Sequence, residues 1–122
     1  MFKQSYTLDH VQLAMPAGQE DRARTFYVEA LGLEEIPKPE ELAKRGGAWF
    51  RGGPLNLHLG VDPVFAPAKK AHPALRSADY DRLLQHLSES GVTVTPDPLL
   101  FDGKPHCYIE DPFGNRIEII AL

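Results

Sequence analysis

The chain repeats one pattern of elements twice, and this repeat constrains its fold more than any other feature. Each copy reads as strand, amphipathic helix and three further strands, with glycine-marked turns. Residues 10 and 72 are both histidine and residues 52 and 114 both glycine, so each pair is separated by 62 positions. We expect unit one at about residues 7–62, a linker at about 62–70 and unit two at about 71–122. About 60 residues bury too little surface to fold alone, so the two units should form a single domain.

Hydrophobic periodicity predicts two helices, at about residues 19–31 and 79–90, each with one apolar stripe and a glycine just after its end. Alternation of apolar and polar residues predicts the strands. The segment 37–41 is expected to be a solvated loop. The predicted strands lie at about residues 8–15, 34–37, 48–51, 55–61, 72–76, 92–96, 105–110 and 116–121.

Composition and charge exclude several classes of protein. The 122 residues are 43% hydrophobic and 25% charged, which is typical of one globular domain. The net charge is −4 and no run of Lys or Arg is longer than the pair Lys69-Lys70, which argues against a nucleic-acid partner. No stretch approaches the ~20 apolar residues of a membrane span. The single Cys107 excludes an internal disulfide and fits a reducing compartment, so we expect a cytoplasmic protein.

Successive strand residues point to opposite faces, and this rule separates an aliphatic face from a polar one in the predicted strands. The polar face holds histidine, amide, arginine and glutamate residues, where a solvated face would hold mainly lysine, threonine, serine and glutamate. Imidazole nitrogens together with a carboxylate are the donors that a divalent metal requires. Spacing alone leaves open a plain solvent-exposed face. The polar-face residues are His10, Gln12, Asn56, His58, His72, Arg76, Arg116 and Glu118.

Three segments carry a more specific signal. They are residues 8–14 followed by 23–33, residues 71–75, and residues 108–119 with the sequence Asp-Pro-Phe-Gly-Asn-Arg-Ile-Glu at 111–118. Together they resemble the vicinal oxygen chelate superfamily, which contains glyoxalase I, fosfomycin-resistance thiol transferases, extradiol dioxygenases and bleomycin-binding proteins. The resemblance implies an α+β fold in which paired βαβββ units form a curved mixed sheet around a cavity, completed as a homodimer.

The resemblance also implies metal ligands in the opening and closing strands of each unit. His10, His72 and Glu118 occupy three of these positions with suitable side chains. The 62-residue offset makes Asn56 the counterpart of Glu118, and an asparagine is a poor ligand. His58, two residues further on the same face, is the alternative for this fourth position. The expected cofactor is a divalent ion such as zinc, manganese, nickel or iron.

The leading interpretation is a metal-dependent enzyme that acts on a small, oxygen-rich substrate by lyase, transferase or dioxygenase chemistry. The ion would stabilise an oxyanion or enolate. Gln12, Asn56, Arg51, Arg76 and Arg116 are the candidates for binding the substrate. The alternative is a non-catalytic protein that sequesters a small molecule or an antibiotic, as bleomycin-binding proteins do.

Other conspicuous side chains have simpler interpretations. We expect His86 at the surface and His106 at a strand end rather than in a cavity wall. Cys107 should be a small buried residue. The aromatic residues at strand positions are expected in the core, and these are Trp49, Phe50 and Tyr108.

Overall fold

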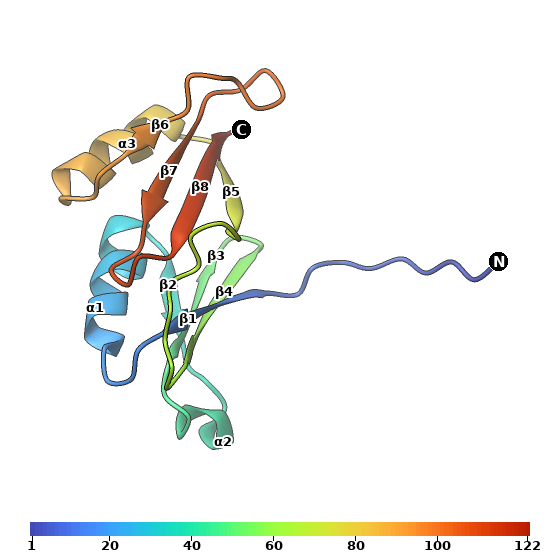
Figure 1. The fold of residues 1–122 in the computed structure, drawn as a ribbon, viewed down its shortest axis with the longest axis vertical. Coiled ribbons are helices and arrows are strands. Elements are labelled where there is room, and N and C mark those ends of the chain that lie inside the picture. The colour runs from blue at the N-terminus through green and yellow to red at the C-terminus, as the bar shows by residue number, and fades with distance from the viewer.

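The computed structural model describes all 122 residues and contains two four-stranded mixed sheets, which lie one above the other in Figure 1. The strand orders are β1-β4-β3-β2 and β5-β8-β7-β6. The first sheet and its helices comprise β1 (Val11–Met15), α1 (Glu20–Arg24), η1 (Thr25–Ala30), β2 (Glu34–Ile36), α2 (Glu40–Ala43), β3 (Ala48–Gly52) and β4 (Leu55–Val61). The second comprises β5 (Ala74–Ser77), α3 (Tyr80–Glu89), β6 (Thr95–Pro96), β7 (His106–Glu110) and β8 (Arg116–Ala121).

Both sheets have the same topology. The opening strand of each unit pairs in parallel with its last strand, β1 with β4 and β5 with β8, and the remaining pairs are antiparallel. A parallel pair needs a crossover connection, which the helix after each opening strand begins. The predicted α+β fold of paired βαβββ units is confirmed.

The first predicted helix is divided into two kinds of helix. α1 has α-helical geometry, and the chain then continues as the six-residue π-helix η1. The apolar stripe in the sequence does not distinguish an α-helix from a π-helix over so short a stretch. The wider turn of the π-helix shifts the buried positions by less than one residue per turn. The prediction of a plain loop at 37–41 is wrong, since α2 begins at Glu40.

Three predicted strands begin at least two residues later than expected. One of them is β5, which starts at Ala74, so His72 precedes the strand. β1 starts at Val11, so His10 precedes the strand and belongs to an exposed segment, Met1–His10, that projects from the body. Within the predicted strand at 92–96 only Thr95 and Pro96 pair with β7. The N–H of Val92 donates to the carbonyl of Leu87, so the chain stays attached to the end of α3 before it joins the sheet.

The apolar faces of both sheets and the helices form one hydrophobic cluster. Tyr27 and Phe50 stack within it at a ring-centroid distance of 5.2 Å, and Leu87 of α3 and Ile117 of β8 are fully buried. Cys107 is also fully buried, as expected of a small apolar residue. Burial of apolar side chains is the main favourable contribution to such a fold. No helix is long and apolar enough to cross a membrane.

A buried polar network connects the two units. The hydroxyl of Tyr27 donates to the Oδ2 atom of Asp111 over 2.7 Å. The side-chain amide of Asn115 donates to Asp111 and to the backbone carbonyl of Ala14 in β1, while its Oδ1 atom accepts from the N–H of Ala68. The Asp-Pro-Phe-Gly-Asn turn therefore attaches the second unit to the first helix, the first strand and the linker.

Candidate functional site

The polar face of the second sheet is centred on a buried carboxylate. Glu118 of β8 is only 6% exposed, and each of its oxygens meets a histidine. Its Oε1 atom lies 3.0 Å from Nε2 of His72, just before β5, and its Oε2 atom lies 2.7 Å from Nδ1 of His106, at the start of β7. Three segments far apart in the sequence thus converge on one carboxylate.

The backbone determines which nitrogen of His72 faces Glu118 with its lone pair. Nδ1 of His72 lies 2.8 Å from the carbonyl oxygen of Lys70, which can only accept a hydrogen bond, so Nδ1 carries a proton. In the neutral ring the Nε2 lone pair then faces the carboxylate of Glu118. Two acceptors 3.0 Å apart require a cation between them, either a proton or a metal ion. A backbone carbonyl that holds the distal nitrogen is the usual support of a metal-binding histidine.

Tyr108 and Arg116 extend the same face. The Tyr108 ring packs edge-on against both His72 and His106, with a centroid distance of 5.8 Å in each case. The guanidinium of Arg116 lies over the Tyr108 ring at 5.0 Å and forms no ion pair with a carboxylate. Burial, and then the negative charge of Glu118, raise the pKa of Tyr108, so its phenol stays protonated at neutral pH.

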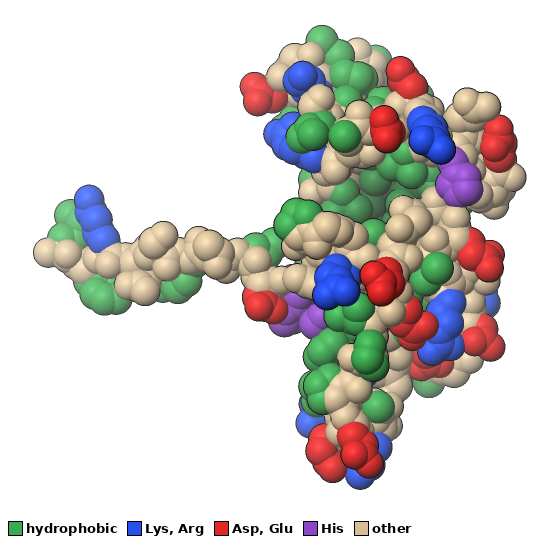
Figure 2. Space-filling model, turned by 180° about the vertical axis from the view of Figure 1, so that it is seen from behind, with side chains coloured by type: hydrophobic (Ala, Val, Ile, Leu, Met, Phe, Trp, Pro, Cys, Tyr) green, Lys and Arg blue, Asp and Glu red, His purple; other side chains and the backbone are tan.

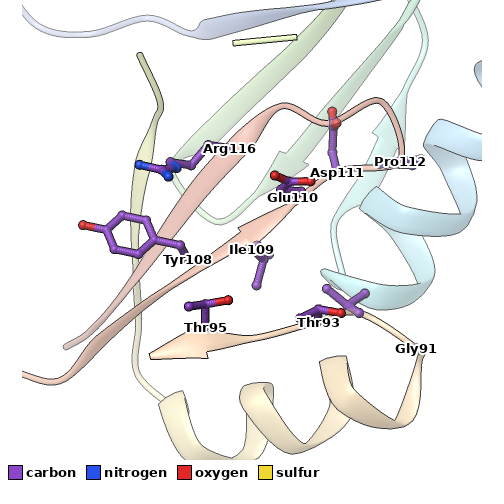
Figure 3. Close-up of a pocket in the computed structure, with 10 residues that line it drawn as sticks. Gly91, Thr93, Thr95, Tyr108, Ile109, Glu110, Asp111, Pro112 and Arg116 are labelled. Carbon is purple, nitrogen blue, oxygen red and sulfur yellow. The ribbon is translucent and has the colours of Figure 1, made fainter. Parts of the chain in front are cut away.

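A cavity of about 600 Å³ opens beside these two residues (Figure 3). Tyr108 and Arg116 lie along one side, and Thr93 and Thr95 come from the segment after α3 on the other. The segment at 92–94 does not pair with β7, and this leaves the space open. Glu110 and Asp111 also line the cavity, but Glu110 is paired with Lys69, and Asp111 accepts from Tyr27 and Asn115. The free guanidinium of Arg116, the hydroxyl groups and the aromatic ring suit a small molecule with an anionic group.

The polar face of the first sheet carries three stacked rings. His58 of β4 lies between His10 and Trp49, with ring-centroid distances of 4.2 Å and 4.1 Å. Burial, and then the neighbouring His10, lower the pKa of His58, which favours the neutral ring that binds metals. The outer ring, His10, has Nδ1 at 2.8 Å from Oδ1 of Asp9.

The predicted substrate-binding residues lie on these two faces. Gln12 is opposite His58 in the strand ladder, and Arg51 is opposite Asn56, so all four lie on the face of the first sheet that carries the rings. Arg51 is exposed and lies 3.8 Å from Glu34. In the second sheet Arg76 and Arg116 alternate with Leu75 and Ile117, so both share the face of Glu118.

The strand register corrects the counterpart of Glu118. Glu118 is opposite Ala74 in β5 and Tyr108 in β7, whereas His58 is opposite Gln12 in β1 and Trp49 in β3. Gln12 lies two residues after His10, and Ala74 lies two residues after His72. The residues opposite them in the parallel pairs, His58 and Glu118, are therefore equivalent. The expectation that the 62-residue offset makes Asn56 the counterpart is wrong, because the loops inside the two units differ in length.

Within one chain the predicted ligands form two separate groups. His10 and His58 are in contact, and His72 and Glu118 are in contact, but no hydrogen bond or ring contact joins one group to the other. No three His, Cys, Asp or Glu side chains lie together in a geometry that would hold a metal ion. The planes of His10 and His58 are 17° apart, and stacked rings cannot both direct an in-plane lone pair at one ion.

Sequence reasoning missed three members of these groups. His106 opens β7, at a strand end as expected, but it is only 6% exposed and holds Glu118, which the sequence did not indicate. Trp49 and Tyr108 pack on the polar faces, and of the three aromatic residues expected in the core only Phe50 is there. Alternation along β7 would have found His106, because it lies two residues from Tyr108 on the face of Glu118. His86 is exposed, as expected, and its Nε2 meets the carbonyl of Glu29 at 2.8 Å.

The family model of the Glyoxalase/Bleomycin resistance protein/Dioxygenase superfamily matches residues 7–119. The chain belongs to this superfamily. A glyoxalase family protein from Bacillus anthracis is 48% identical, with a TM-score of 0.93 over 99% of this chain and 98% of the other. TnmS3, an antibiotic-binding protein from Streptomyces sp. CB03234, is 25% identical, with a TM-score of 0.71 over 96% of this chain and 98% of the other.

A curated member of the superfamily is also similar. The lactoylglutathione lyase GLX1 of Arabidopsis thaliana is 28% identical over 84% of this chain. The match covers 40% of the plant protein, so the chain spans less than half the length of this relative. Members of the superfamily commonly use divalent metals. His72 Nε2 and Glu118 Oε1, with the Lys70 carbonyl behind His72, are donors of the kind that such an ion binds, but within one chain they form only part of a ligand set.

Proposed function

We propose that the chain is a metal-dependent enzyme of this superfamily that acts on a small, oxygen-rich substrate. The observation that carries the proposal is the 3.0 Å approach of His72 Nε2 to Glu118 Oε1, with the other ring nitrogen held by the Lys70 carbonyl. His10 would complete a set of two histidines and one carboxylate, which leaves coordination positions open for the substrate. His58 supports His10 by stacking, and it is the candidate for a fourth ligand in an arrangement in which the stack opens.

The residues around this set suggest how a substrate would be held. A bound zinc, manganese, nickel or iron ion would polarise two neighbouring substrate oxygens as a Lewis acid. Arg116, which has no carboxylate partner, would bind an anionic group of the substrate beside the Tyr108 ring. Gln12 and Asn56 would contact the part of the substrate near His58. Lyase, transferase and dioxygenase reactions are all compatible with this arrangement.

We also propose that two copies of the chain form the complete site. His10 and His58 lie in unit one, His72 and Glu118 lie in unit two, and the two pairs do not touch. In a homodimer in which unit one of each copy faces unit two of the other, the pairs would meet at two equivalent sites. We expect the protein in the cytoplasm, with a small molecule rather than a nucleic acid or a membrane as its partner. The net charge of −4 disfavours nucleic acids and anionic membranes as partners.

Metal titration tests the proposal. Protein purified without a histidine tag should bind one divalent ion per chain, measured by elemental analysis and by calorimetry with zinc, manganese, nickel and ferrous ions. His72→Ala and Glu118→Gln should each weaken binding at least tenfold. His86→Ala is the matched control, because this exposed histidine lies on neither polar face and should leave binding unchanged. Absence of binding, or equal binding by all three variants, would refute the metal site.

A substrate screen then separates the reaction classes. Methylglyoxal hemithioacetal tests a lyase, fosfomycin with a thiol tests a transferase, and catechols with oxygen test a dioxygenase. Turnover should disappear in Glu118→Gln and should weaken mainly through KM in Arg116→Ala, since the guanidinium binds the substrate without chelating the ion.

The second candidate function is sequestration of an antibiotic or another small molecule without catalysis. The observation in its favour is the similarity to the antibiotic-binding protein TnmS3 over nearly the whole of both chains. Bleomycin would then quench the fluorescence of Trp49, the only tryptophan, in the presence of a chelator. Quenching that survives His72→Ala, without turnover of any substrate, would favour this candidate over the enzyme.

A further inference from the structure

β6 pairs with β7 over only two residues, and a cavity opens where this pairing stops. Thr95 pairs with Tyr108, so the same antiparallel register would place Thr93 opposite Glu110. No hydrogen bond joins these two residues, and Thr93 has no backbone hydrogen bond at all. The cavity of about 600 Å³ lies between the segment that carries Thr93 and the strand that carries Glu110 (Figure 3).

The backbone of Glu110 directs both of its polar groups into this cavity. In an antiparallel strand the N–H and C=O of one residue point to the same side, and successive residues alternate between the two sides. The N–H of Asp111 donates to the carbonyl of Asn115 on the side of β8, and the carbonyl of His106 accepts from the N–H of Asp97 on the side of β6. Glu110 is one residue from Asp111 and four from His106. Its N–H and C=O therefore point to the side of β6, where no strand lies opposite.

The cavity has the shape of a wedge. It is closed at one end, because Thr95 and Tyr108 are paired there and paired strands lie only about 4.8 Å apart. An inserted peptide strand would need this spacing on both of its sides, about 10 Å in all, along its whole length. A compact ring or a short branched chain fits such a space, whereas an extended peptide does not.

The lining of the wedge is mainly polar. A second cavity, of about 500 Å³, is lined mainly by apolar side chains, and apolar side chains are visible in the hollow between the two halves of the molecule in Figure 2. In the wedge, by contrast, the guanidinium of Arg116 and the hydroxyl groups of Thr93 and Thr95 have no hydrogen-bond partner within the chain. The ligand of the wedge is therefore a polar molecule.

The free groups indicate which polar molecule fits. A free guanidinium is the complement of a carboxylate. Two neighbouring hydroxyl groups are the complement of the N–H and C=O of Glu110, because one hydroxyl oxygen accepts from the N–H while the other hydroxyl donates to the carbonyl. Threonine hydroxyls both donate and accept, so they suit further hydroxyl groups. The side chain of Glu110 opposes an anion only weakly, because Lys69 lies 3.4 Å from its carboxylate.

We propose that the wedge binds a compact polyhydroxylated carboxylic acid, such as a sugar acid. Its carboxylate lies on Arg116, and its neighbouring hydroxyl groups bind the backbone of Glu110 and the hydroxyls of Thr93 and Thr95.

The identification of this acid as the substrate rests on the proposed function, whereas the binding site itself needs no metal ion. Arg116 precedes Glu118 by two residues on the same face of β8, which is roughly 7 Å along the strand. An acid of six carbons with its carboxylate on Arg116 therefore reaches the side of Glu118. The small, oxygen-rich substrate is then a hydroxylated acid that offers further oxygens to the ion.

Calorimetry with four probes tests the ligand class on protein that has been stripped of metal ions and dialysed. Gluconate has the carboxylate and the hydroxyl groups, glucitol has only the hydroxyl groups, hexanoate has only the carboxylate, and N-acetylglycine has a carboxylate and an amide. Gluconate should bind at least tenfold more tightly than each of the other three. Absence of gluconate binding, equal binding of hexanoate, or tighter binding of N-acetylglycine would overturn the proposal.

Nuclear magnetic resonance of isotope-labelled protein locates the ligand. Gluconate should shift the backbone amide signals of Thr93, Thr95 and Glu110 and the Nε–H signal of Arg116. The side-chain amide of Asn56, in the first sheet, is the internal control and should not move. Shifts that are confined to the first sheet or spread evenly over the protein would overturn the assignment to the wedge.

Side-chain substitutions test the individual contacts. Thr93→Val and Thr95→Val keep the branched shape and remove one hydroxyl each, so each should weaken gluconate binding roughly three- to tenfold. Arg116→Gln should weaken it at least tenfold and abolish the preference for gluconate over glucitol. Thr25→Val, at an exposed threonine of η1 outside the cavity, is the matched control and should change nothing. Wild-type affinity in all three cavity variants would overturn the proposal.

Glu110→Pro tests the backbone contact. Proline has no N–H, but the N–H of Glu110 points away from β8, so the substitution removes no hydrogen bond of the sheet. Glu110→Pro should weaken gluconate binding at least fivefold, whereas Glu110→Gln keeps the N–H and should bind at least as tightly as the parent protein. Equal affinity of the two variants would refute the backbone contact. Thermal unfolding checks that both variants fold, and if Glu110→Pro does not, the amide shift of Glu110 in the parent protein decides the same point.

Metal titration of the same protein separates this inference from the proposed function. Gluconate binding by a protein that binds no divalent ion refutes the metal-dependent function alone. A divalent ion bound through His72 and Glu118, without gluconate binding, overturns the sugar-acid site alone.

Discussion

His106 and Glu118 form a buried hydrogen-bonded pair, with Nδ1 of the histidine 2.7 Å from Oε2 of the carboxylate. The other ring nitrogen of His106 lies 2.9 Å from the carbonyl of Leu99, which orients the imidazole from behind. Oε1 of Glu118 is left facing His72. His106 is therefore a positioning residue: it acts through Glu118 and presents one carboxylate oxygen to the predicted metal site.

Replacement of His106 by alanine should weaken divalent-ion binding about 10- to 100-fold, the effect typical of a lost supporting contact to a metal ligand. His106→Asn should restore much of the affinity, because its amide can donate to Glu118 from nearly the same place as Nδ1. Calorimetric titration with zinc measures both, and the electronic absorption of bound cobalt reports the geometry. If alanine and asparagine variants bind equally, His106 does not position Glu118.

The ring stack of the first sheet gives a prediction that separates two roles of His58. If His58 only supports His10, His58→Phe keeps a flat ring between His10 and Trp49 and should retain metal affinity, whereas His58→Ala should lose it. If His58 is a ligand, the stack must open and both variants should lose affinity alike. Because the stacked rings cannot share one ion, we expect the first outcome, and calorimetry with the two variants decides it.

Much of the fold could be predicted from the sequence because its signals are local. The alternation of Leu55, Leu57 and Leu59 with polar residues fixes the two faces of β4, and the glycines after both helices mark their ends. The repeat then supplied the pairing of the two units. Even the polar faces could be predicted, since period 2 determines which side chains share a face.

The remaining errors concern relations between strands, which no single strand contains. Counting along the chain assigns Asn56 to the position of Glu118, but hydrogen-bond register assigns His58. The stretch from Ala74 to Tyr108 is three residues shorter than its equivalent from Gln12 to Trp49, while the last hairpin is only one residue longer. His106 is separated from Glu118 by the turn at 111–115 and meets it only diagonally across two strands. Such contacts depend on register, and a change of one or two residues in a loop moves them.

Cys107 should be unreactive in the folded protein. The residue is fully buried, and burial raises the pKa of its thiol, so little of the nucleophilic thiolate exists at neutral pH. Reaction with a disulfide reagent such as 5,5′-dithiobis(2-nitrobenzoate) should be at least 100-fold slower in buffer than in denaturant. Since the chain has one cysteine, the signal has a single source. Rapid reaction in buffer would mean that β7 is accessible in the native state.

The buried Tyr27 should make the protein sensitive to alkali. Burial, and then the charge of Asp111, raise the pKa of its phenol well above the usual value of 10.0 in the folded state. Below pH 10 both states keep the proton, so the stabilising contribution is complete. As the pH rises above that value the unfolded chain releases the proton first, and the free energy of unfolding falls.

Tyr27→Phe tests this prediction and the junction between the units together. At pH 7 the variant should lose about 1–2 kcal/mol, because the buried Asp111 carboxylate loses one donor. Above pH 10 the difference from the parent protein should shrink, because phenylalanine has no proton to release. Urea unfolding of both proteins between pH 7 and pH 11 measures the two slopes. Tyr6→Phe, at an exposed tyrosine of the segment Met1–His10, is the control and should change neither the stability nor its pH dependence.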